Sequence, residues 1–395
     1  MTRAAQPTDR VVVAGHICLD LIPTFAPGKT GVRLDPGTLV QVGPALRSTG
    51  GAVSNTGLAL HRLGADVTLM GKVGDDPFGR DVLELLRQRD PALAEGMAVV
   101  TGEHTSYSIV VSPPGVDRMF LHCPGANDTF GPEDINPDRL AGAKLLHFGY
   151  PPIMKRMYRE GGRELAQLLS EARQLGTATS LDTCDLDPDT EAGQTDWRSL
   201  LERVLPHVDV FAPSFDELCY MLQGPANEVG SPTPERLARL AETLLAMGAA
   251  VVVIKLGEHG LYLRTTDDRA RLEQVPGDLL RDIDAWLGRE LLSPCFEVEV
   301  VGANGSGDCT IAGLLAAILR GETPEQAATA ATAVGACNVE SADATTGVRP
   351  WPEVEARLKQ GWARRKPASA FADWAAHAGD IRTGPHDRPR QQASA

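Results

Sequence analysis

Several features that mark specialised proteins are missing from this sequence. No apolar run reaches the length of about 18 residues that indicates a membrane-spanning helix, so no membrane partner is expected. The seven cysteines stand singly and form no CxxC pair, which argues against a zinc site and against a disulfide framework. The first residues are polar and lack the apolar core of a signal peptide, and we therefore expect a cytoplasmic protein.

Positive charge is scarce relative to negative charge. Lys and Arg number 38 against 52 Asp and Glu, which gives a formal net charge of −14. A chain of this charge repels nucleic acid at long range, so nucleic acid is not an expected partner. It also repels nucleotides. A nucleotide site in this chain would therefore need backbone N–H groups, a helix terminus, a lysine or a metal ion.

What the sequence does contain is a regular alternation of strand and helix patterns. Val11–Ala14, Leu145–Phe148 and Ala250–Leu256 are short apolar runs typical of buried strands. Ala52–Leu63 and Thr310–Leu319 are typical of helices. Strands that alternate with helices of this length indicate βαβ units, so we expect an α/β fold. Its doubly wound, mainly parallel sheet would carry helices on both faces.

Four segments break this alternation. Residues 21–50 are rich in Gly and Pro, and residues 104–123 have the pattern of a β-hairpin, so together they are expected to form a small separate β-sheet. Residues 266–294 have the composition of a charged, irregular insertion. Residues 366–395 show little periodicity and are expected to be a mostly disordered tail. The expected folded domain spans residues 9–365.

The most informative stretch lies directly before the helix expected at Thr310–Leu319. The alternating run Phe296–Val301 is expected to form a strand that leads into Gly305, Ser306 and Gly307. Glycines let a backbone approach a ligand closely. The first N–H groups of a helix lack internal partners and carry partial positive charge. The three small residues are therefore expected to form an anion hole for a phosphate.

Asp308 follows these three residues at the start of the same helix. Beside a bound phosphate, its carboxylate could accept the proton of a substrate hydroxyl that attacks the γ-phosphate. The alternative is that Asp308 only caps the helix, which is a common role for Asp. The sequence pattern alone leaves both interpretations open.

Two signatures resemble those of the PfkB, or ribokinase-like, carbohydrate kinases. The run from Gly50 to Asn55 and the run from Gly71 to Gly79 are together similar to the N-terminal signature of the family. The run from Gly305 to Asp308, with the helix that follows, is similar to the C-terminal signature. The resemblance covers roughly residues 10–350. It implies a β-lid over a sugar site, for which 21–50 and 104–123 are the candidates.

The resemblance also implies roles for individual residues. The acceptor would contact Asp20, Gly50, Gly51 and Asn55, and the nucleotide would contact Lys255, Gly257 and Gly260. Glu217 would lie near Mg²⁺ and contact it through water, so ATP and Mg²⁺ are the expected cofactors. Each residue has a plainer interpretation: a turn Asp, a helix cap, a solvated lysine, or an acid that favours the first turn of a helix.

Four positions depart from the family pattern, one of which is Asn304, where a Thr is usual. Gly302 stands where the family usually has an Asp that helps to bind a monovalent cation, which counts against K⁺ activation. Ser214 replaces an Asn beside Glu217, and Ala52 stands where ribose-specific members have a Lys. Ribose is therefore not the favoured acceptor.

The combined interpretation is a kinase that transfers the γ-phosphate of ATP to a hydroxyl, expected to be primary, of a sugar or sugar-like polyol. Asp308 would be the base. A nucleoside kinase of the same fold is one alternative, and a non-catalytic protein that senses a sugar or nucleotide is another. The sequence does not fix the oligomeric state, although the resemblance favours a homodimer formed through the lid.

Overall fold

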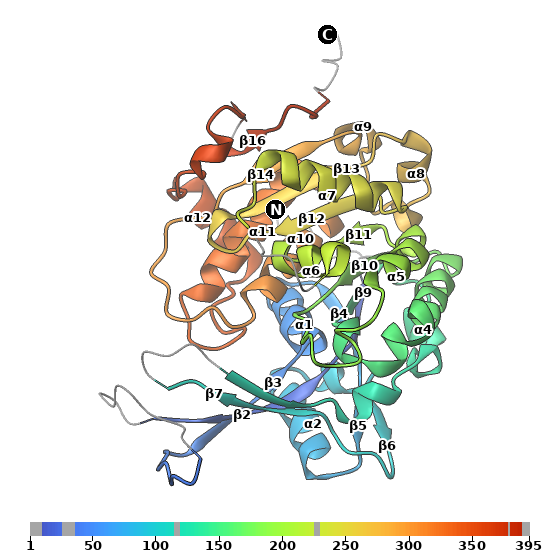
Figure 1. Ribbon diagram of the computed structural model, residues 1–395, viewed down its shortest axis with the longest axis vertical. Helices are drawn as coiled ribbons and strands as arrows, with labels where there is room; N and C mark the ends of the chain where they lie inside the picture. The colour runs from blue at the N-terminus through green and yellow to red at the C-terminus, as the bar shows by residue number, and fades with distance from the viewer. Residues whose placement is uncertain (1–9, 26–35, 114–118, 225–229, 378–379, 389–395) are drawn as a thin grey trace.

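The computed structural model describes residues 10–25, 36–113, 119–224, 230–377 and 380–388, and its centre is one large sheet. Within these residues the sheet has ten strands (Figure 1). Six run parallel, in the spatial order β4 (Asp66–Met70), β1 (Arg10–Gly15), β9 (Leu145–Gly149), β10 (Ala178–Asp182), β11 (Val210–Phe211) and β12 (Val251–Lys255). Antiparallel strands continue the sheet as β13 (Leu261–Thr265), β14 (Glu290–Ser293), β16 (Arg382–Thr383) and β15 (Ala375–Ala376).

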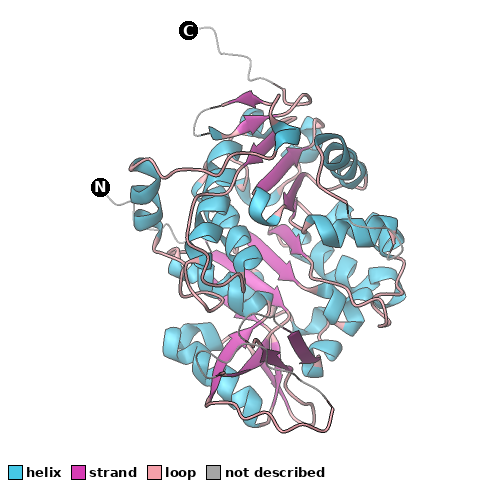
Figure 2. Cartoon of the chain, turned by 60° about the vertical axis from the view of Figure 1, so that its left-hand side comes forward, coloured by secondary structure: helices cyan, strands magenta, loops and turns pink. Residues whose placement is uncertain are grey.

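Helices cover both faces of this sheet (Figure 2). One face carries α1 (Ala52–Arg62), α10 (Ser306–Arg320) and α11 (Pro324–Val339), and the other carries α4 (Lys155–Gln174), α5 (Trp197–Val204), α6 (Phe215–Gln223) and α7 (Pro234–Ala246). Along β1, Val11 and Val13 belong to the first core, and Val12 and Ala14 to the second. A strand that is buried on both faces needs a continuous apolar run. The expected α/β fold is confirmed.

Helix α10 is apolar almost all round because it packs between α1 and α11. A Cβ atom on Gly313 would lie only 2.7 Å from the carbonyl oxygen of Ala330, so this glycine allows the two helices to approach closely. Helix α11 begins with a capping box, in which the Gln326 side chain accepts a hydrogen bond from the Thr323 amide at 2.9 Å. The close packing and the defined start of α11 fix the orientation of α10, and with it the Gly305–Gly307 turn.

A second sheet lies apart from the large one, in the order β3 (Ala45–Gly50), β2 (Cys18–Pro23), β7 (Tyr107–Val111) and β8 (Met119–Cys123) (Figure 1). β7 and β8 pair antiparallel, which confirms the hairpin predicted within 104–123. The strands in and around 21–50 lie at the two ends of that segment, and residues 26–35 are outside the described part of the chain. Because β2 follows β1 and β3 leads into α1, the small sheet adjoins the large domain beside α1.

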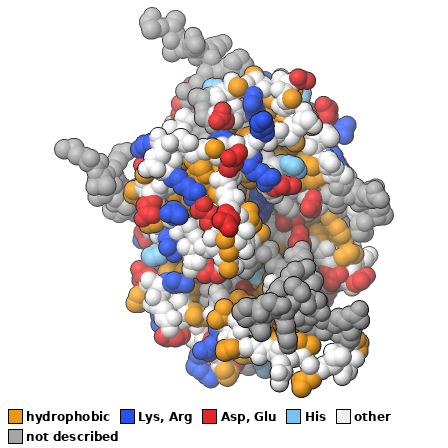
Figure 3. Space-filling model, turned by 90° about the vertical axis from the view of Figure 1, so that its left-hand side faces the viewer, with side chains coloured by type: hydrophobic (Ala, Val, Ile, Leu, Met, Phe, Trp, Pro, Cys, Tyr) orange, Lys and Arg blue, Asp and Glu red, His pale blue; other side chains and the backbone are white. Residues whose placement is uncertain are grey.

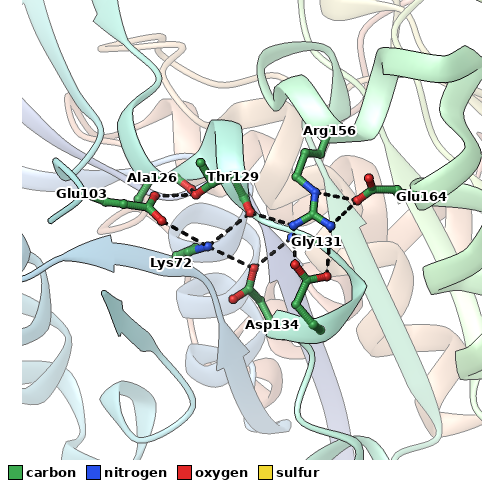
Figure 4. Close-up of polar contacts among 9 residues, drawn as sticks. Lys72, Glu103, Ala126, Thr129, Gly131, Asp134, Arg156 and Glu164 are labelled. Carbon is green, nitrogen blue, oxygen red and sulfur yellow. Dashed lines mark hydrogen bonds and ion pairs between the residues drawn. The ribbon is translucent and has the colours of Figure 1, made fainter. Parts of the chain in front are cut away.

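A polar network ties β5 (Lys72–Gly74) to the start of α4 (Figure 4). The ammonium group of Lys72 lies 3.2 Å from the Thr129 carbonyl oxygen and 3.4 Å from the Asp134 carboxylate. Arg156 donates to the same carbonyl at 3.1 Å and pairs with Glu164 at 2.6 Å. Lys72 belongs to the N-terminal signature, so this part of the signature holds the domain together.

The prediction of a strand at Phe296–Val301 is wrong. The structure instead forms β14 at Glu290–Ser293, inside the segment 266–294 that was expected to be irregular, and all four residues of β14 are buried. Phe296 makes only an isolated bridge, and Val300 and Val301 are 63% and 58% exposed. Alternating apolar and charged residues suit a strand with one solvent-exposed face. The strand position beside β13 is buried on both faces, so the Phe296–Val301 run does not fit there.

The described part of the tail is folded, so the expectation of a mostly disordered segment at 366–395 is wrong for residues 366–377 and 380–388. β15 and β16 extend the large sheet beyond β14, past the boundary expected at residue 365. The large apolar residues of the described segment, Phe371, Trp374 and Ile381, are 1%, 7% and 0% exposed. A few apolar residues can therefore order a polar segment when each is buried against an existing core.

Acidic and basic side chains are intermingled over the large domain on the face shown in Figure 3. The net charge of −14 is therefore not concentrated in one patch on this face. Among the described residues, no helix is both long enough and apolar enough to cross a membrane.

Candidate active site

The candidate site lies at the carboxyl ends of the parallel strands. The strand register aligns Gly15 at the end of β1 with Gly149 at the end of β9, and Gly149 with Asp182 at the end of β10. His16 and Tyr150 follow directly in the loops, so they lie along one rim of the sheet. Open α/β sheets bind ligands at this rim.

The three residues predicted to form an anion hole lie at the start of α10. Gly305 precedes α10 in the left-handed region at φ 66°, and a Cβ atom there would lie 2.5 Å from the Ala344 carbonyl oxygen, so only glycine fits. Ser306 and Gly307 are the first two residues of α10. The amides in the first turn of a helix have no intrahelical acceptor and point outward, which is the feature by which a helix N-terminus can bind an anion.

Asp308 is the third residue of α10 and does not cap the helix. Its Oδ2 accepts a hydrogen bond from Asn55 Nδ2 at 3.0 Å, and its Oδ1 accepts one from Thr56 Oγ1 at 3.4 Å. The Tyr150 hydroxyl donates to both oxygens, at 2.9 and 2.8 Å. The alternative role as an N-cap is thereby excluded, and the carboxylate faces the predicted acceptor residue Asn55.

Burial dominates the electrostatics of Asp308, which is 3% exposed. Desolvation raises the pKa of this carboxyl above its ordinary value, while the charge of Lys255 and the hydrogen bonds from Tyr150 and Asn55 oppose the rise. A carboxylate with a raised pKa accepts a proton more readily than one in water. The environment therefore suits a general base.

Lys255 lies at the end of β12, beside the anion hole. Its Nζ is 2.7 Å from Asp182 Oδ1 and 3.6 Å from the point where a Cβ atom of Gly307 would lie. Burial by itself lowers the pKa of Lys255, but the charges of Asp182 and Glu217 outweigh it, so the pKa is raised and the lysine keeps its charge. Positive charge is therefore fixed next to the amides that would bind a phosphate.

Glu217 has a structural role that the sequence left open. It closes the capping box of α6 by accepting from the Ser214 amide at 2.9 Å, and it also accepts from Thr183 Oγ1 at 2.6 Å. It is 8% exposed. The interpretation of an acid in the first turn of a helix is correct, and a contact to a metal through water would be an addition to that role.

The donor set fits Mg²⁺ only in a hydrated, phosphate-bound form. Among the described residues, no group of three or more His, Cys, Asp or Glu side chains could hold a metal ion by itself. Asp182 Oδ2 is buried and has no hydrogen-bond partner among the described residues. The carboxylates of Asp182 and Glu217 both interact electrostatically with Lys255. Mg²⁺ usually keeps several waters and binds one or two carboxylates together with substrate phosphates.

The acceptor side of the site begins with Asp20 on β2, which is 7% exposed. Its carboxylate lies against Gly50, where a Cβ atom would be 2.4 Å from Oδ2. The Cys18 thiol donates to Oδ1 at 3.4 Å. Burial raises the pKa of Asp20 to about 6, a rise that the Cys18 and Ser108 hydrogen bonds reduce. The neighbouring Gly50–Gly51 turn leads into α1, which carries Asn55.

Two histidines connect the lid to the large domain. His16 Nε2 and His122 Nε2 are 3.3 Å apart, and His122 Nδ1 lies 2.9 Å from Ser108 Oγ on β7. The His16 ring also lies 6.0 Å from the ring of Tyr150. Gly51 has a φ of 86°, and a Cβ atom there would lie 2.4 Å from His16 Nδ1, so this position requires glycine. The Gly50–Gly51 turn therefore packs against His16, which also lies close to His122 and Tyr150.

Tyr150 has an unusual backbone. It is a non-glycine residue in the left-handed region, with φ 67° and ψ 42°, directly before Pro151. Such a conformation costs on the order of 1–3 kcal/mol and persists only where the surroundings enforce it. The strained backbone directs the side chain of Tyr150 to Asp308.

The structure thus brings most of the predicted residues together and places two more in a neighbouring turn. One group of residues is in mutual contact or adjacent: Asp308, Asn55, Lys255 and the Gly305–Gly307 turn. Asp20 is joined to this group through the Gly50–Gly51 turn. Gly257 and Gly260 lie in the turn between β12 and β13, where Gly260 packs against the Ser293 carbonyl oxygen. The site residues missed from the sequence are His16, Thr56, Tyr150 and Asp182; three of them lie at strand ends, which is the signal that could have found them.

Comparison with known proteins gives one consistent family. The sequence profile described as "pfkB family carbohydrate kinase" matches residues 8–351. Among curated proteins, probable fructokinase-4 of Arabidopsis thaliana is 24% identical over 311 residues, which cover 78% of this chain and 82% of that protein.

Solved structures share the fold. A fructokinase from Xylella fastidiosa with bound ATP has a TM-score of 0.67 at 19% identity, over 89% of this chain and 99% of the other. A putative ribokinase II from E. coli, in complex with ATP and Mg²⁺, has a TM-score of 0.64 at 20% identity over the same shares. At these identities the likeness establishes the fold.

Proposed function

The chain belongs to the pfkB family of carbohydrate kinases and is therefore a phosphotransferase with an alcohol acceptor, and we propose that it transfers the γ-phosphate of ATP to a sugar hydroxyl. The observation that carries this proposal is the position of Asp308. It is a buried carboxylate in the first turn of α10, directly after the predicted anion hole, and its partner Asn55 lies on the helix that follows the Gly50–Gly51 turn. The fructokinases among its relatives support a sugar, and a primary hydroxyl is the proposed acceptor group.

In the proposed reaction each residue group has one task. The amides of Gly305, Ser306 and Gly307 bind the transferring phosphate, and Lys255 balances its charge. Asp20, the Gly50–Gly51 turn and Asn55 hold the acceptor, because buried polar groups specify hydroxyls strongly. The Gly257–Gly260 turn lies beside Lys255 at the end of β12, and we assign it to the nucleotide.

The chemistry balances around Asp308. The carboxylate takes the proton of the acceptor hydroxyl, the acceptor oxygen bonds to the γ-phosphorus, and the bond between that phosphorus and the bridging oxygen breaks, so ADP leaves with the electron pair. Asp182 and Glu217 would hold Mg²⁺ through water, and the bound ion would neutralise charge on the phosphates. The ATP and Mg²⁺ in the related E. coli structure support both as cofactors.

Replacing Asp308 by Asn tests the function directly. A panel of ketoses, aldoses, polyols and nucleosides is offered with Mg·ATP, and transfer to the best acceptor is then measured in the variant. We expect turnover to fall about 10²–10⁴-fold, the contribution typical of a general base, with the fold retained. Asp66→Asn, at the amino end of β4, is the matched control. Near-normal turnover in Asp308→Asn would sink the mechanism.

We also propose that two copies pair through their lids. The large apolar side chains exposed on the small sheet are Leu46, Met119, Phe120 and Leu121, each 48–58% exposed. They lie on the two edge strands of this sheet, β3 and β8, and exposed apolar surface at such a place marks an interaction site. Leu121→Glu is expected to convert a dimer to a monomer in light scattering after size exclusion. Leu175→Glu, at a 47% exposed position of the large domain, should leave the mass unchanged. A wild-type monomer would refute the pairing.

A further inference from the structure

The Tyr150 hydroxyl covers the side of the Asp308 carboxylate that Asn55 and Thr56 leave open. Two carboxylate oxygens together offer about four lone-pair sites. Asn55 and Thr56 each take one, and the Tyr150 hydroxyl lies 2.9 and 2.8 Å from the two oxygens, where it shares its single proton between them. An acceptor hydroxyl must itself come within about 2.6–3.2 Å of the base. An acceptor that approaches between the two oxygens must therefore displace a donor that is already there.

The three donors differ in how easily they can move. Asn55 and Thr56 lie in the first half of α1, where they are 6% and 0% exposed and held by the helix. Tyr150 lies in the loop between β9 and the turn at Pro151–Ile153, is only half-buried, and is held in a strained left-handed conformation. Burial and the Asp308 charge raise the pKa of Tyr150, so its hydroxyl stays protonated and donates. Tyr150 is therefore the donor that can yield.

We propose that Tyr150 is a positioning residue that occupies the proton-accepting face of Asp308 and is displaced by the acceptor hydroxyl. The inference rests on the proposed function, since it assumes that Asp308 is the base. Its consequence is coupling: without an acceptor, the Tyr150 hydroxyl hinders water from using the base, so ATP is hydrolysed only slowly. In the uncoupled reaction, water would attack the γ-phosphorus, its proton would pass to Asp308, and ADP would leave with the electron pair.

The surroundings of Tyr150 suit displacement by an acceptor rather than by water alone. The ring of Tyr150 lies 6.0 Å from that of His16, which contacts the lid through His122. Asn55 Oδ1 is buried and has no hydrogen-bond partner within the described chain, while its Nδ2 binds Asp308. A polyol that gives one hydroxyl to Asn55 Oδ1 and another to Asp308 would recover the bonds that Tyr150 loses. Water makes no such paired contact, so the polyol displaces Tyr150 more favourably.

The test compares wild type with Tyr150→Phe, which keeps the ring and removes the hydroxyl. ATP hydrolysis without acceptor is expected to rise about tenfold, because a hydrogen bond to a charged group is worth roughly that factor. The acceptor KM is expected to fall by about the same factor, because the binding-competent state is no longer a minor population. In Tyr150→Phe with Asp308→Asn, hydrolysis should return to the level of Asp308→Asn alone.

Tyr262→Phe is the matched control. It also removes a buried tyrosine hydroxyl from a carboxylate, since Tyr262 donates to Glu290 at 2.7 Å, but it lies on β13 away from the site. Its melting temperature should fall while hydrolysis without acceptor stays at the wild-type level. A second measurement needs no folded variant: acceptor binding to the wild-type protein should change its tyrosine absorption, because the Tyr150 hydroxyl leaves a carboxylate.

The outcomes separate the inference from the proposed function. If wild type phosphorylates no acceptor, or Asp308→Asn is unimpaired, the proposed function itself fails. If transfer depends on Asp308, yet Tyr150→Phe hydrolyses ATP no faster than wild type and keeps its acceptor KM, Tyr150 has only a structural role and the inference is overturned. If Tyr150→Phe is unfolded, an unchanged tyrosine spectrum on acceptor binding to wild type overturns it equally.

Discussion

Four carboxylates are buried along one rim of the sheet, and each has a different kind of neighbour. Asp182 has the ammonium group of Lys255, Glu217 has an amide and a hydroxyl, and Asp308 has three donors. Asp20 has only the weak, neutral donors of Cys18 and Ser108. The desolvation of a carboxylate is offset least where its donors are weak and neutral. Asp20, whose pKa burial raises to about 6, is therefore the acceptor-side group that titrates close to neutral pH. On the phosphate side, burial also raises the pKa of Asp182, to about 8, although the charge of Lys255 opposes the rise.

This gives a prediction for acceptor binding. Burial raises the pKa of Asp20 to about 6, so above that pH the carboxylate is ionised and accepts from acceptor hydroxyls. As the pH falls through about 6 it becomes protonated, and the acceptor KM is expected to rise. Asp20→Asn should raise this KM about tenfold at neutral pH, because a charge-assisted hydrogen bond is lost. Initial rates measured against acceptor concentration across the pH range give both results.

Protonation of Asp20 is expected to weaken acceptor binding but to stabilise the folded state. A pH effect on binding can therefore be distinguished from unfolding. The folded pKa of Asp20 is above its ordinary value of 3.8, so protonated Asp20 favours the folded state at low pH, and that contribution is lost as pH rises through about 6. A rise in KM at low pH is thus no sign of unfolding through Asp20. His16 and His122 lie close by, and burial lowers the pKa of both. If Asp20→Asn kept the pH dependence of wild type, the histidines would be responsible and the prediction would be wrong.

At the scale of elements, α10 and its glycine turn were predictable from sequence because their constraints are local. Gly305 needs a left-handed backbone, and the amides of the first turn of α10 are free by the geometry of any helix. The position of Asp308 follows from both. The same holds for the β7–β8 hairpin, whose strands are separated by a short turn segment.

The contacts of Tyr150 and His16 were not predictable, because they depend on strand register. Tyr150 lies 158 positions from Asp308 in the sequence, and its place directly after a strand does not say which residue it contacts. The two meet because β9 ends beside β1 and β10, which a single sequence does not specify. The same reason explains the wrong strand at Phe296–Val301: the place beside β13 selects a run that is buried on both faces, and only the assembled sheet defines that place.

At the scale of the whole molecule, the C-terminal segment completes the core. The Trp374 ring packs 5.3 Å from Phe371 and 6.1 Å from Tyr262, which lies in the middle of β13. Asp387 pairs with Arg289, a 4% exposed residue just before β14, at 2.9 Å. These contacts cover strands that adjoin β12, the strand that carries Lys255.

The segment should therefore contribute strongly to stability. Trp374→Ala removes a 7% exposed ring from this cluster, and the lost burial and the cavity are expected to cost about 3–5 kcal/mol in the free energy of unfolding. Urea unfolding followed by circular dichroism measures the change. Asp373→Ala, at the exposed neighbouring position, should change stability by less than about 0.5 kcal/mol.

The same two variants show whether the C-terminal segment unfolds together with the core or is only loosely packed against it. If residues 369–388 packed only loosely, Trp374→Ala and Asp373→Ala would have equal stabilities, and the sheet would effectively end at β14. If they are part of the core, Trp374→Ala should lose stability and kinase activity in one transition on heating, because β14, β13 and β12 are consecutive strands of one sheet and unfold together. An activity loss well below the unfolding temperature would instead show that Lys255 and the C-terminal segment belong to separate cooperative units.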